Sequence, residues 1–449
     1  MTSLRSRPVR GTFLHAPERG SIEVLADAIV LVDAAGTIRS VSRPGEADHQ
    51  RLSARSDLVS LPEGQIVIPG FVDLHVHAPQ YPQLGKALDV PLEVWLGQYT
   101  FPLEAAYADL DFAHKRYSAL VEDLLASGTT TALYFATIHR AASELLARIC
   151  LAMGQRALVG RVAMDDPAAC PDYYRDASPE ASVNETRAFI ESVKALPSND
   201  RVLPVITPRF IPSCSDAALT GLGALAQETG CHVQTHCSES DWAHGHVLQR
   251  FGHTDAEALD GFGLLTRRSV LAHSVFITDS DMALVKARGT GIAHCALSNM
   301  YFGNAVFPLR RALEKGLHVG LGTDISGGPS GSMIEACRAT VQASRMLEDG
   351  VDVSKPANER GVPHARVDML TAFHLATAGG GEALDLPIGL FRPGYQFDAV
   401  LVDPDAPKGT IRRFGETDPA KLIEPILYTA TRPNLARVYV SGDLVSEQS

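Results

Sequence analysis

Four histidines and one aspartate are the residues of this sequence whose types and spacing are best suited to holding a metal ion. His75 and His77 are two residues apart in FVDLHVH, so in a β-strand both side chains project from the same face. His236, His273 and Asp324 each close another short apolar segment. Imidazole and carboxylate donors without a thiolate suit zinc or iron(II). We therefore predict one divalent metal held by His75, His77, His236 and Asp324, with His273 on the metal's water or completing the shell.

A carboxylate follows the third of these histidines at short range. Glu239 lies three residues beyond His236 in HCSES. An open coordination position would leave a bound water with a pKa of roughly 7, and a neighbouring carboxylate can carry its protons. A glutamate in the first turn of a helix is also favoured by the helix dipole, which is the structural alternative. Beside a metal we prefer the catalytic interpretation, with Glu239 as proton shuttle and His273 and Asp324 as the other catalytic groups.

These residues can meet only if the segments that carry them end at one place. From residue 70 onwards, apolar segments alternate with helix-like segments, which is typical of repeated βα units. Eight such units predict a (β/α)8 TIM barrel, whose C-terminal strand ends carry the active site. The predicted strands are 71–77, 129–136, 157–164, 201–207, 231–236, 269–273, 290–295 and 317–324. Helices are predicted at 179–196, opened by Ser178 and Pro179, and at 215–229, closed by Gly230.

The two chain ends have a different, β-like character. Residues 28–33 and 37–42 indicate a hairpin with a glycine-bearing turn. Residues 397–403 and 437–445 are again β-like. We predict a barrel over 70–386 and one small β-sandwich domain formed from 1–69 and 387–449.

Composition excludes several classes of protein. The chain has 449 residues, is 45% hydrophobic and 20% charged, and carries a formal net charge of −12, which fits a globular protein without affinity for nucleic acid. It contains no apolar stretch of the roughly 20 residues needed to span a bilayer. Its seven cysteines include no CxxC pair, which fits neither a disulfide framework nor a thiolate zinc site. We expect a cytoplasmic protein with no membrane partner.

Several motifs together resemble the amidohydrolase superfamily, in its mononuclear deaminase branch. They are PGFVDLHVH, the HxxE that begins at His236, the AH pair ending at His273, and the GTD that ends at Asp324. The resemblance covers nearly the whole chain, because PGYQFDAVLVDP and VYVSGDLV are similar to the closing strands of that superfamily. Two-metal members usually need a bridging lysine, and the predicted third and fourth strands contain none. The resemblance also implies a homodimer.

Three further sets of segments resemble the guanine deaminases within that superfamily. They are HAPQYPQLG, EVWLGQYTFPLE together with GTTTALYFATIH, and TPRF. The resemblance implies hydrolysis of the small molecule guanine to xanthine and ammonia, with Gln80, Arg209 and Phe210 binding the base. A planar purine suits the aromatic face of Phe210 and the forked donor of Arg209. The alternative for Phe210 alone is core packing.

One segment departs from the family pattern. The family commonly shows HCPxSN at the seventh strand, whereas this chain has HCALSN from His294 to Asn299. The departure leaves the shape of the following loop open, and with it the fine shape of the purine pocket. His294 is interpreted as structural, because the other positions already fill the metal site.

Other readings of the same residues remain at this point. A deaminase of a pterin or another aminoheterocycle, or a cyclic amide hydrolase, would use the same metal and acid groups, although Gln80 and the PRF segment argue against it. A non-catalytic binding or scaffold protein is a third possibility, against which the intact ligands and Glu239 argue. The separate cluster of His244, His246 and His253 lacks strand-end placement and predicts a solvated helix or loop.

Overall fold

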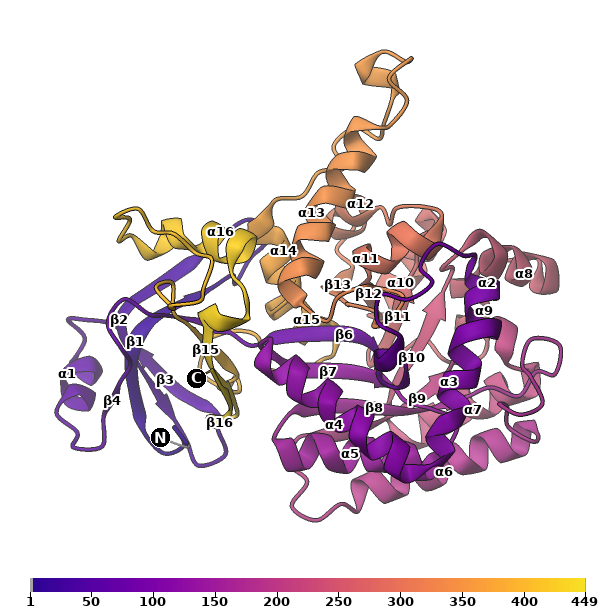
Figure 1. Cartoon of the computed structure of the whole chain (residues 1–449), viewed down its shortest axis with the longest axis horizontal. Helices are drawn as coiled ribbons and strands as arrows, with labels where there is room; N and C mark the ends of the chain where they lie inside the picture. The colour runs from indigo at the N-terminus through magenta and orange to yellow at the C-terminus, as the bar shows by residue number, and fades with distance from the viewer. Residues whose placement is uncertain (1–2, 449) are drawn as a thin grey trace.

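Two β-sheets organise the chain in the computed structural model, which describes residues 3–448. An eight-stranded parallel sheet with the order β6 to β13 forms the larger part, on the right of Figure 1. The second sheet, on the left, combines strands from both ends of the chain. The predicted architecture of a TIM-type barrel with a small β-domain is therefore confirmed.

The barrel strands follow the eight predicted segments closely. Each strand pairs with the next one in the sequence in parallel register, as repeated βα units require. The bounds are β6 (Phe71–His77), β7 (Thr129–Phe135), β8 (Arg156–Ala163), β9 (Val202–Pro208), β10 (His232–Cys237), β11 (Ser269–His273), β12 (Gly291–His294) and β13 (His318–Leu321).

Most of the barrel helices lie between consecutive strands and cover the outside of the sheet (Figure 1). Their bounds are α4 (Leu110–Ala126), α5 (Arg140–Met153), α6 (Pro179–Lys194), α7 (Asp216–Thr229), α8 (Asp241–Phe251), α9 (Asp255–Gly261), α10 (Asp279–Arg288), α12 (Leu309–Glu314), α13 (Met333–Asp349), α14 (Met369–Leu375) and α15 (Ala378–Ala383). The other helices lie in the loops and chain ends: α1 (Ala47–Ser53), α2 (Leu92–Trp95), α3 (Phe101–Ala105), α11 (Ala296–Ser298) and α16 (Pro419–Thr429).

The two helices predicted from their end signals are present. The Ser178 hydroxyl accepts a hydrogen bond from the backbone N–H of Ala181, which caps α6. Gly230 ends α7 in the left-handed conformation, with φ +61°, which glycine adopts at little cost. Helix α6 ends at Lys194, two residues before the predicted limit of 196.

The barrel closes between its first and last strands at the residues predicted to bind metal. The backbone N–H of Asp324 donates to the carbonyl of His75 at 2.8 Å, and that of His77 donates to the carbonyl of Ile325 at 2.9 Å. Gly322 permits this close approach, because a Cβ there would lie 2.8 Å from the Cβ of His75. Strand β13 itself ends at Leu321, so Asp324 lies three residues beyond the strand in which it was predicted.

The sheet from the chain ends has the order β16-β15-β14-β5-β1-β2-β3, with β4 paired to β1. The predicted hairpin is confirmed, since β2 and β3 pair antiparallel from Ile29 opposite Ser42 to Val32 opposite Ile38. The strand bounds are β1 (Pro8–His15), β2 (Glu23–Val32), β3 (Ile38–Ser42), β4 (Val59–Ser60), β5 (Ile66–Pro69), β14 (Ala399–Val402), β15 (Leu435–Val440) and β16 (Asp443–Glu447).

A buried ion pair joins this sheet to the barrel. The guanidinium of Arg156, at the start of β8, donates to both carboxylate oxygens of Asp398 at 3.1 and 3.2 Å and to the hydroxyl of Ser441 at 2.9 Å. Asp398 is buried and also accepts from the backbone N–H of Ser441. The domain limits at 69/70 and 386/387 stay a prediction.

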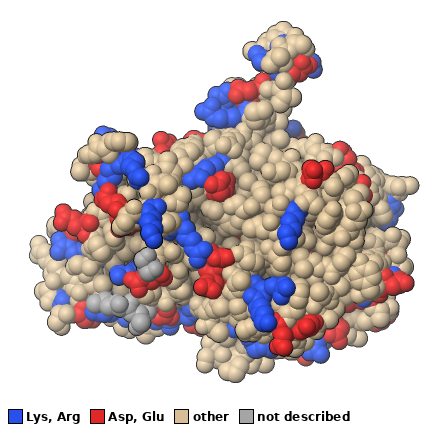
Figure 2. Space-filling view, viewed as in Figure 1, with Lys and Arg blue, Asp and Glu red and all other residues tan. Residues whose placement is uncertain are grey.

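Surface and cysteine chemistry agree with the expectations from composition. On the face shown in Figure 2, acidic and basic side chains are interspersed rather than gathered by sign. All seven cysteines are free and buried. Within residues 3–448, no helix has both the length and the apolar character that a membrane crossing requires.

Candidate active site

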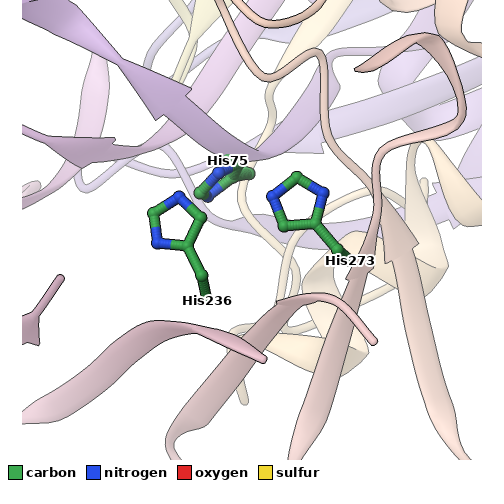
Figure 3. Close-up of side chains that lie close together, drawn as sticks. All are labelled: His75, His236 and His273. Atoms are coloured by element: carbon green, nitrogen blue, oxygen red, sulfur yellow. The ribbon is translucent and has the colours of Figure 1, made fainter. Parts of the chain in front are cut away.

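The predicted metal ligands come together at the C-terminal ends of the barrel strands. His75 and His77 lie on β6, His236 on β10 and His273 at the end of β11, while Asp324 follows β13. Figure 3 shows His75, His236 and His273 close together, each reaching in from a different strand. All five side chains are almost fully buried, with relative exposures between 0% and 8%. The barrel thus concentrates five metal-competent groups in one water-poor space.

The distances between these groups are those of a single coordination centre. The Nε2 atoms of His77 and His236 are 2.9 Å apart. Asp324 Oδ1 lies 3.2 Å from His75 Nε2 and 3.6 Å from His77 Nε2, and its Oδ2 lies 3.8 Å from His273 Nε2. Ligand atoms from these residues lie within 4.8 Å of one another in several groups of three. One ion can therefore reach all of them.

The electrostatics of the centre favour neutral imidazoles, the form that binds a metal. Burial lowers the pKa of His75, His77 and His236 well below the usual value, and neighbouring positive charges lower it further. Burial also lowers the pKa of His273, although the charge of Asp324 opposes this shift.

Hydrogen bonds to the opposite ring nitrogens point two of the histidines at the centre. His236 Nδ1 lies 2.6 Å from the carbonyl oxygen of Arg209, which can only accept, so the proton is on Nδ1 and the lone pair is on Nε2. His273 Nδ1 pairs in the same way with Asn299 Oδ1 at 2.9 Å. Such outer partners fix both the orientation and the tautomer of a metal-binding histidine.

Some ring nitrogens at the centre form no hydrogen bond within the described part of the chain. His75 Nε2 and His273 Nε2 are buried and form no hydrogen bond. Buried polar atoms are normally satisfied, so an unpaired lone pair here needs an explanation. A divalent ion supplies one, and the donor set of imidazole nitrogens and a carboxylate oxygen suits such an ion. The residues present therefore fit a metal.

Glu239 lies beside this centre, as predicted. Its Oε1 is 3.6 Å from His273 Nε2. Burial raises the pKa of Glu239 to about 8, and the charge of Asp324 adds to the increase. Burial also raises the pKa of Asp324, although His273 opposes it. Two carboxyl groups that resist ionisation beside one centre are suited to exchanging protons.

Unusual backbone conformations occur at the same strand ends. His273 has φ +67° and Asp324 has φ +50°, both in the left-handed region. Non-glycine residues rarely adopt this region, and those that do cluster at functional sites. Asp73 stabilises the turn before Asp324, because its carboxylate accepts from the backbone and hydroxyl of Thr323 and from the N–H of His75.

A cavity opens over the predicted metal ligands. The three predicted base-binding residues, Gln80, Arg209 and Phe210, all line it. It combines polar groups on one side with an apolar wall on the other, which is typical of small-molecule sites. The remaining lining residues are His77, His236, Glu239, Asp324 and Gly327, with the apolar set Leu92, Trp95, Leu96 and Phe302.

The sequence analysis did not predict the apolar wall of the cavity, formed by Leu92, Trp95, Leu96 and Phe302, or one charged residue near the cavity. Phe302 belongs to the π-helical turn η5 (Asn299–Gly303), which lies in the loop where the sequence departs from the family pattern. Glu104, on α3, is fully buried and binds Arg209. The segment that contains Glu104 resembles the family, but the sequence alone shows no reason to connect it with a residue 105 positions away.

The structure agrees with the interpretation of His294, but it shows that His244 and His246 are less solvated than predicted. His294 is buried against the ring of Phe307 and lies outside the groups of metal-competent ligands found in residues 3–448. His244 and His246 are partly buried on α8, and His244 Nδ1 pairs with Asp255 at 2.8 Å. None of His244, His246 and His253 belongs to those metal-competent groups.

The chain is similar over almost its full length to several known proteins. It is 36% identical to a probable guanine deaminase of Schizosaccharomyces pombe, over 97% of this chain and 82% of that one. It is 36% identical to the guanine deaminase of Homo sapiens, over 97% of this chain and 96% of that one. The structure of the guanine deaminase from C. acetobutylicum, with guanine bound in its active site, matches with a TM-score of 0.87 and 30% identity, covering 98% of this chain and 100% of that one.

The family comparison covers the barrel and the strands β5, β14 and β15 of the outer sheet. The model of the amidohydrolase family matches residues 66–445, which include every barrel strand and all the ligands described above. Barrel, clustered ligands and family match agree, and the chain therefore belongs to the amidohydrolase family.

Proposed function

We propose that this protein hydrolyses guanine to xanthine and ammonia. The observation that carries the proposal is a single cavity in which Gln80, Arg209 and Phe210 face the cluster of His77, His236, Glu239 and Asp324. Relatives of 32–36% identity over most of the chain are guanine deaminases, which supports the same substrate. The reaction adds the oxygen of water to C2 of the base and breaks the bond from C2 to the amino nitrogen.

The metal in this proposal is one zinc ion per chain, with iron(II) as the other candidate. His75, His77, His236 and Asp324 would hold it, with His273 beside them. When bound, such an ion acts as a Lewis acid and makes water a nucleophile at neutral pH. The burial of every donor favours this role, because little bulk water competes for the ion.

The residues around the centre manage the protons of the reaction. Glu239 takes a proton from the attacking water and delivers it to a ring nitrogen of guanine. Asp324 shares the second proton, which leaves with the amino group as ammonia. His273 stabilises the charge that develops at C2 as an imidazolium, in which Nδ1 donates to Asn299 and Nε2 also carries a proton. Phe210 and the apolar wall hold the planar base so that C2 faces these groups.

The proposal is tested by incubating the metal-loaded protein with guanine and measuring both products. We expect ammonia and xanthine in equal amounts, because each turnover releases one of each. A pterin and a cyclic amide, offered under the same conditions, test the alternatives. If the protein turned over either compound faster than guanine, the proposal that guanine is the substrate would be wrong.

Replacing Glu239 by glutamine separates proton transfer from metal binding. Glutamine keeps the size of the side chain but cannot accept and return a proton, so we expect turnover to fall on the order of 100-fold or more. The metal content should stay at the wild-type value, because Glu239 is outside the predicted ligand set. Near wild-type turnover in this variant would contradict the role of Glu239 and mean that another group carries the proton.

The remaining expectations rest on the sequence and the family. We propose a homodimer, a cytoplasmic location, and a division of the chain into a barrel at 70–386 and a domain from both ends. The free, buried cysteines support the reducing compartment.

A further inference from the structure

Glu104 is a fully buried carboxylate that the proposed reaction does not use. It lies on α3 and does not line the cavity. Two of its three side-chain partners, Arg209 and Gln80, nevertheless do line it. A buried charge is costly unless it is paired and hydrogen-bonded, so its position requires partners of matching strength.

The carboxylate of Glu104 binds three side chains at once. Its Oε2 accepts from Arg209 Nη1 at 2.6 Å and from the hydroxyl of Tyr174 at 2.8 Å. Its Oε1 accepts from Gln80 Nε2 at 2.8 Å and from Arg209 Nη2 at 3.1 Å. Arg209, directly after β9, and Gln80, in η1 (Ala78–Gln83), are the two proposed purine-binding residues, and both are held by the same group.

These bonds determine how Arg209 and Gln80 face the base. The forked end of Arg209 is turned to Glu104, which leaves Nε–H and the second N–H of each terminal nitrogen as the guanidinium donors that a purine could use. A carboxylate accepts but does not donate, so Gln80 must present its Nε2 to Glu104. Its Oε1 then accepts from the backbone N–H of Ser326 at 3.2 Å. The Gln80 amide consequently has one orientation.

The ion pair of Glu104 and Arg209 also leaves no net charge on the part of the site that faces the base. Although burial lowers the pKa of Arg209, Glu104 raises it above the ordinary value, so the guanidinium stays charged. Phe101, on the same helix as Glu104, lies with its ring 5.0 Å from the guanidinium carbon. Burial and the charge of Glu104 raise the pKa of Tyr174 well above its usual value, so its hydroxyl remains a donor. Arg209 therefore meets the base as half of a neutral pair.

We propose that Glu104 is a positioning residue that sets the purine specificity of this site. It does so by fixing the donors of Arg209 and Gln80 and by neutralising the charge of Arg209, so that neutral guanine binds well and acidic xanthine is not retained. Xanthine carries a second carbonyl beside its ring N–H groups, which makes it more acidic than hypoxanthine. An unpaired arginine would hold the xanthine anion. The inference rests on the proposed function for its choice of ligands.

Two variants separate the two parts of this role. Glu104→Gln keeps the size of the side chain but removes its charge. It also places amide N–H groups opposite the N–H and O–H donors of Arg209, Gln80 and Tyr174. We expect kcat/KM for guanine to fall about 100-fold, mostly through KM, because Glu104 does not touch the reacting atoms. In mildly alkaline buffer, the preference for xanthine over hypoxanthine in binding should rise about tenfold. Glu104→Asp keeps the charge but shortens the reach, so KM should rise while this preference stays at the wild-type value.

Asp398→Asn is the matched control, because Asp398 is the carboxylate of another buried arginine pair, far from the cavity. It should lower thermal stability and leave KM, the oxypurine preference and the metal content unchanged. Metal content, measured by elemental analysis, should be equal in all variants.

The role of Glu104 is overturned if Glu104→Gln keeps both the KM and the oxypurine preference of the wild type. If that variant does not fold, a wild-type KM in Glu104→Asp overturns it. Failure of the proposed function looks different: the wild-type protein would release no ammonia from guanine. The ratio of the xanthine and hypoxanthine binding constants, measured by calorimetry on the wild type and Glu104→Gln, would then still decide whether Glu104 sets ligand preference.

Discussion

Replacement of His75 or His236 by alanine is expected to remove the bound metal and abolish activity. Each imidazole contributes one of the few donors at the centre, and each is buried where water replaces it poorly. The loss should appear as a fall from one metal ion per chain to none in elemental analysis of the purified variants. Adding excess metal to the variants should not restore ammonia release from guanine.

A matched control is available within the same chain. His253 is exposed and belongs to the cluster interpreted as solvated, so His253→Ala should keep the metal and full activity. Two metal ions per chain in the wild-type protein, or activity in a metal-free preparation, would contradict the single-metal centre.

The second large effect is discrimination between guanine and adenine, which we expect to be roughly 10⁴-fold in kcat/KM. Guanine has a carbonyl at C6, whereas adenine has an amino group there. Arg209 carries only donors, is 2% exposed and is fixed by Glu104, so it cannot turn away from adenine. A buried donor that faces another donor loses its hydrogen bond without compensation from water. Rates of ammonia release from the two bases, and from cytosine, measure this discrimination.

Arg209→Lys tests the same contact from the side of the protein. Lysine keeps the positive charge but has a single nitrogen, which cannot bind both oxygens of Glu104 and also the base. We expect the variant to lose most of kcat/KM for guanine and to retain its metal. Wild-type kcat/KM in the lysine variant, or comparable turnover of adenine by the wild-type protein, would mean that another residue reads the purine edge.

The predicted ligands and the proposed proton shuttle illustrate what spacing within a short segment can reveal. His75 and His77 alternate on one strand, and Glu239 follows His236 by three residues. Strand periodicity places His75 and His77 on one face. Glu239 lies beyond the end of β10, so its position near His236 was predicted only from closeness in the sequence. The eight strands were also predicted from local pattern, since each is a continuous apolar segment bounded by turn residues.

Other features depend on contacts between segments that are distant in the sequence. Asp324 was predicted on the eighth strand but lies three residues past it, because the turn is held by Asp73 and by the backbone of His75. Phe302 reaches the cavity from a π-helical turn that no periodic pattern announces. In both cases the position is decided by how two strand ends pack together.

The sequence by itself predicted the barrel, the metal-competent residues and the carboxylate beside them, because each depends on the type and local spacing of a few side chains. It did not reveal that Glu104 engages the fork of Arg209 and fixes the amide of Gln80. That arrangement brings a short helix, a strand end and a 3-10 turn to one buried point. Only the tertiary structure decides such a contact. A buried charge is stable only when hydrogen-bonding partners offset the cost of its desolvation, and the whole fold supplies those partners.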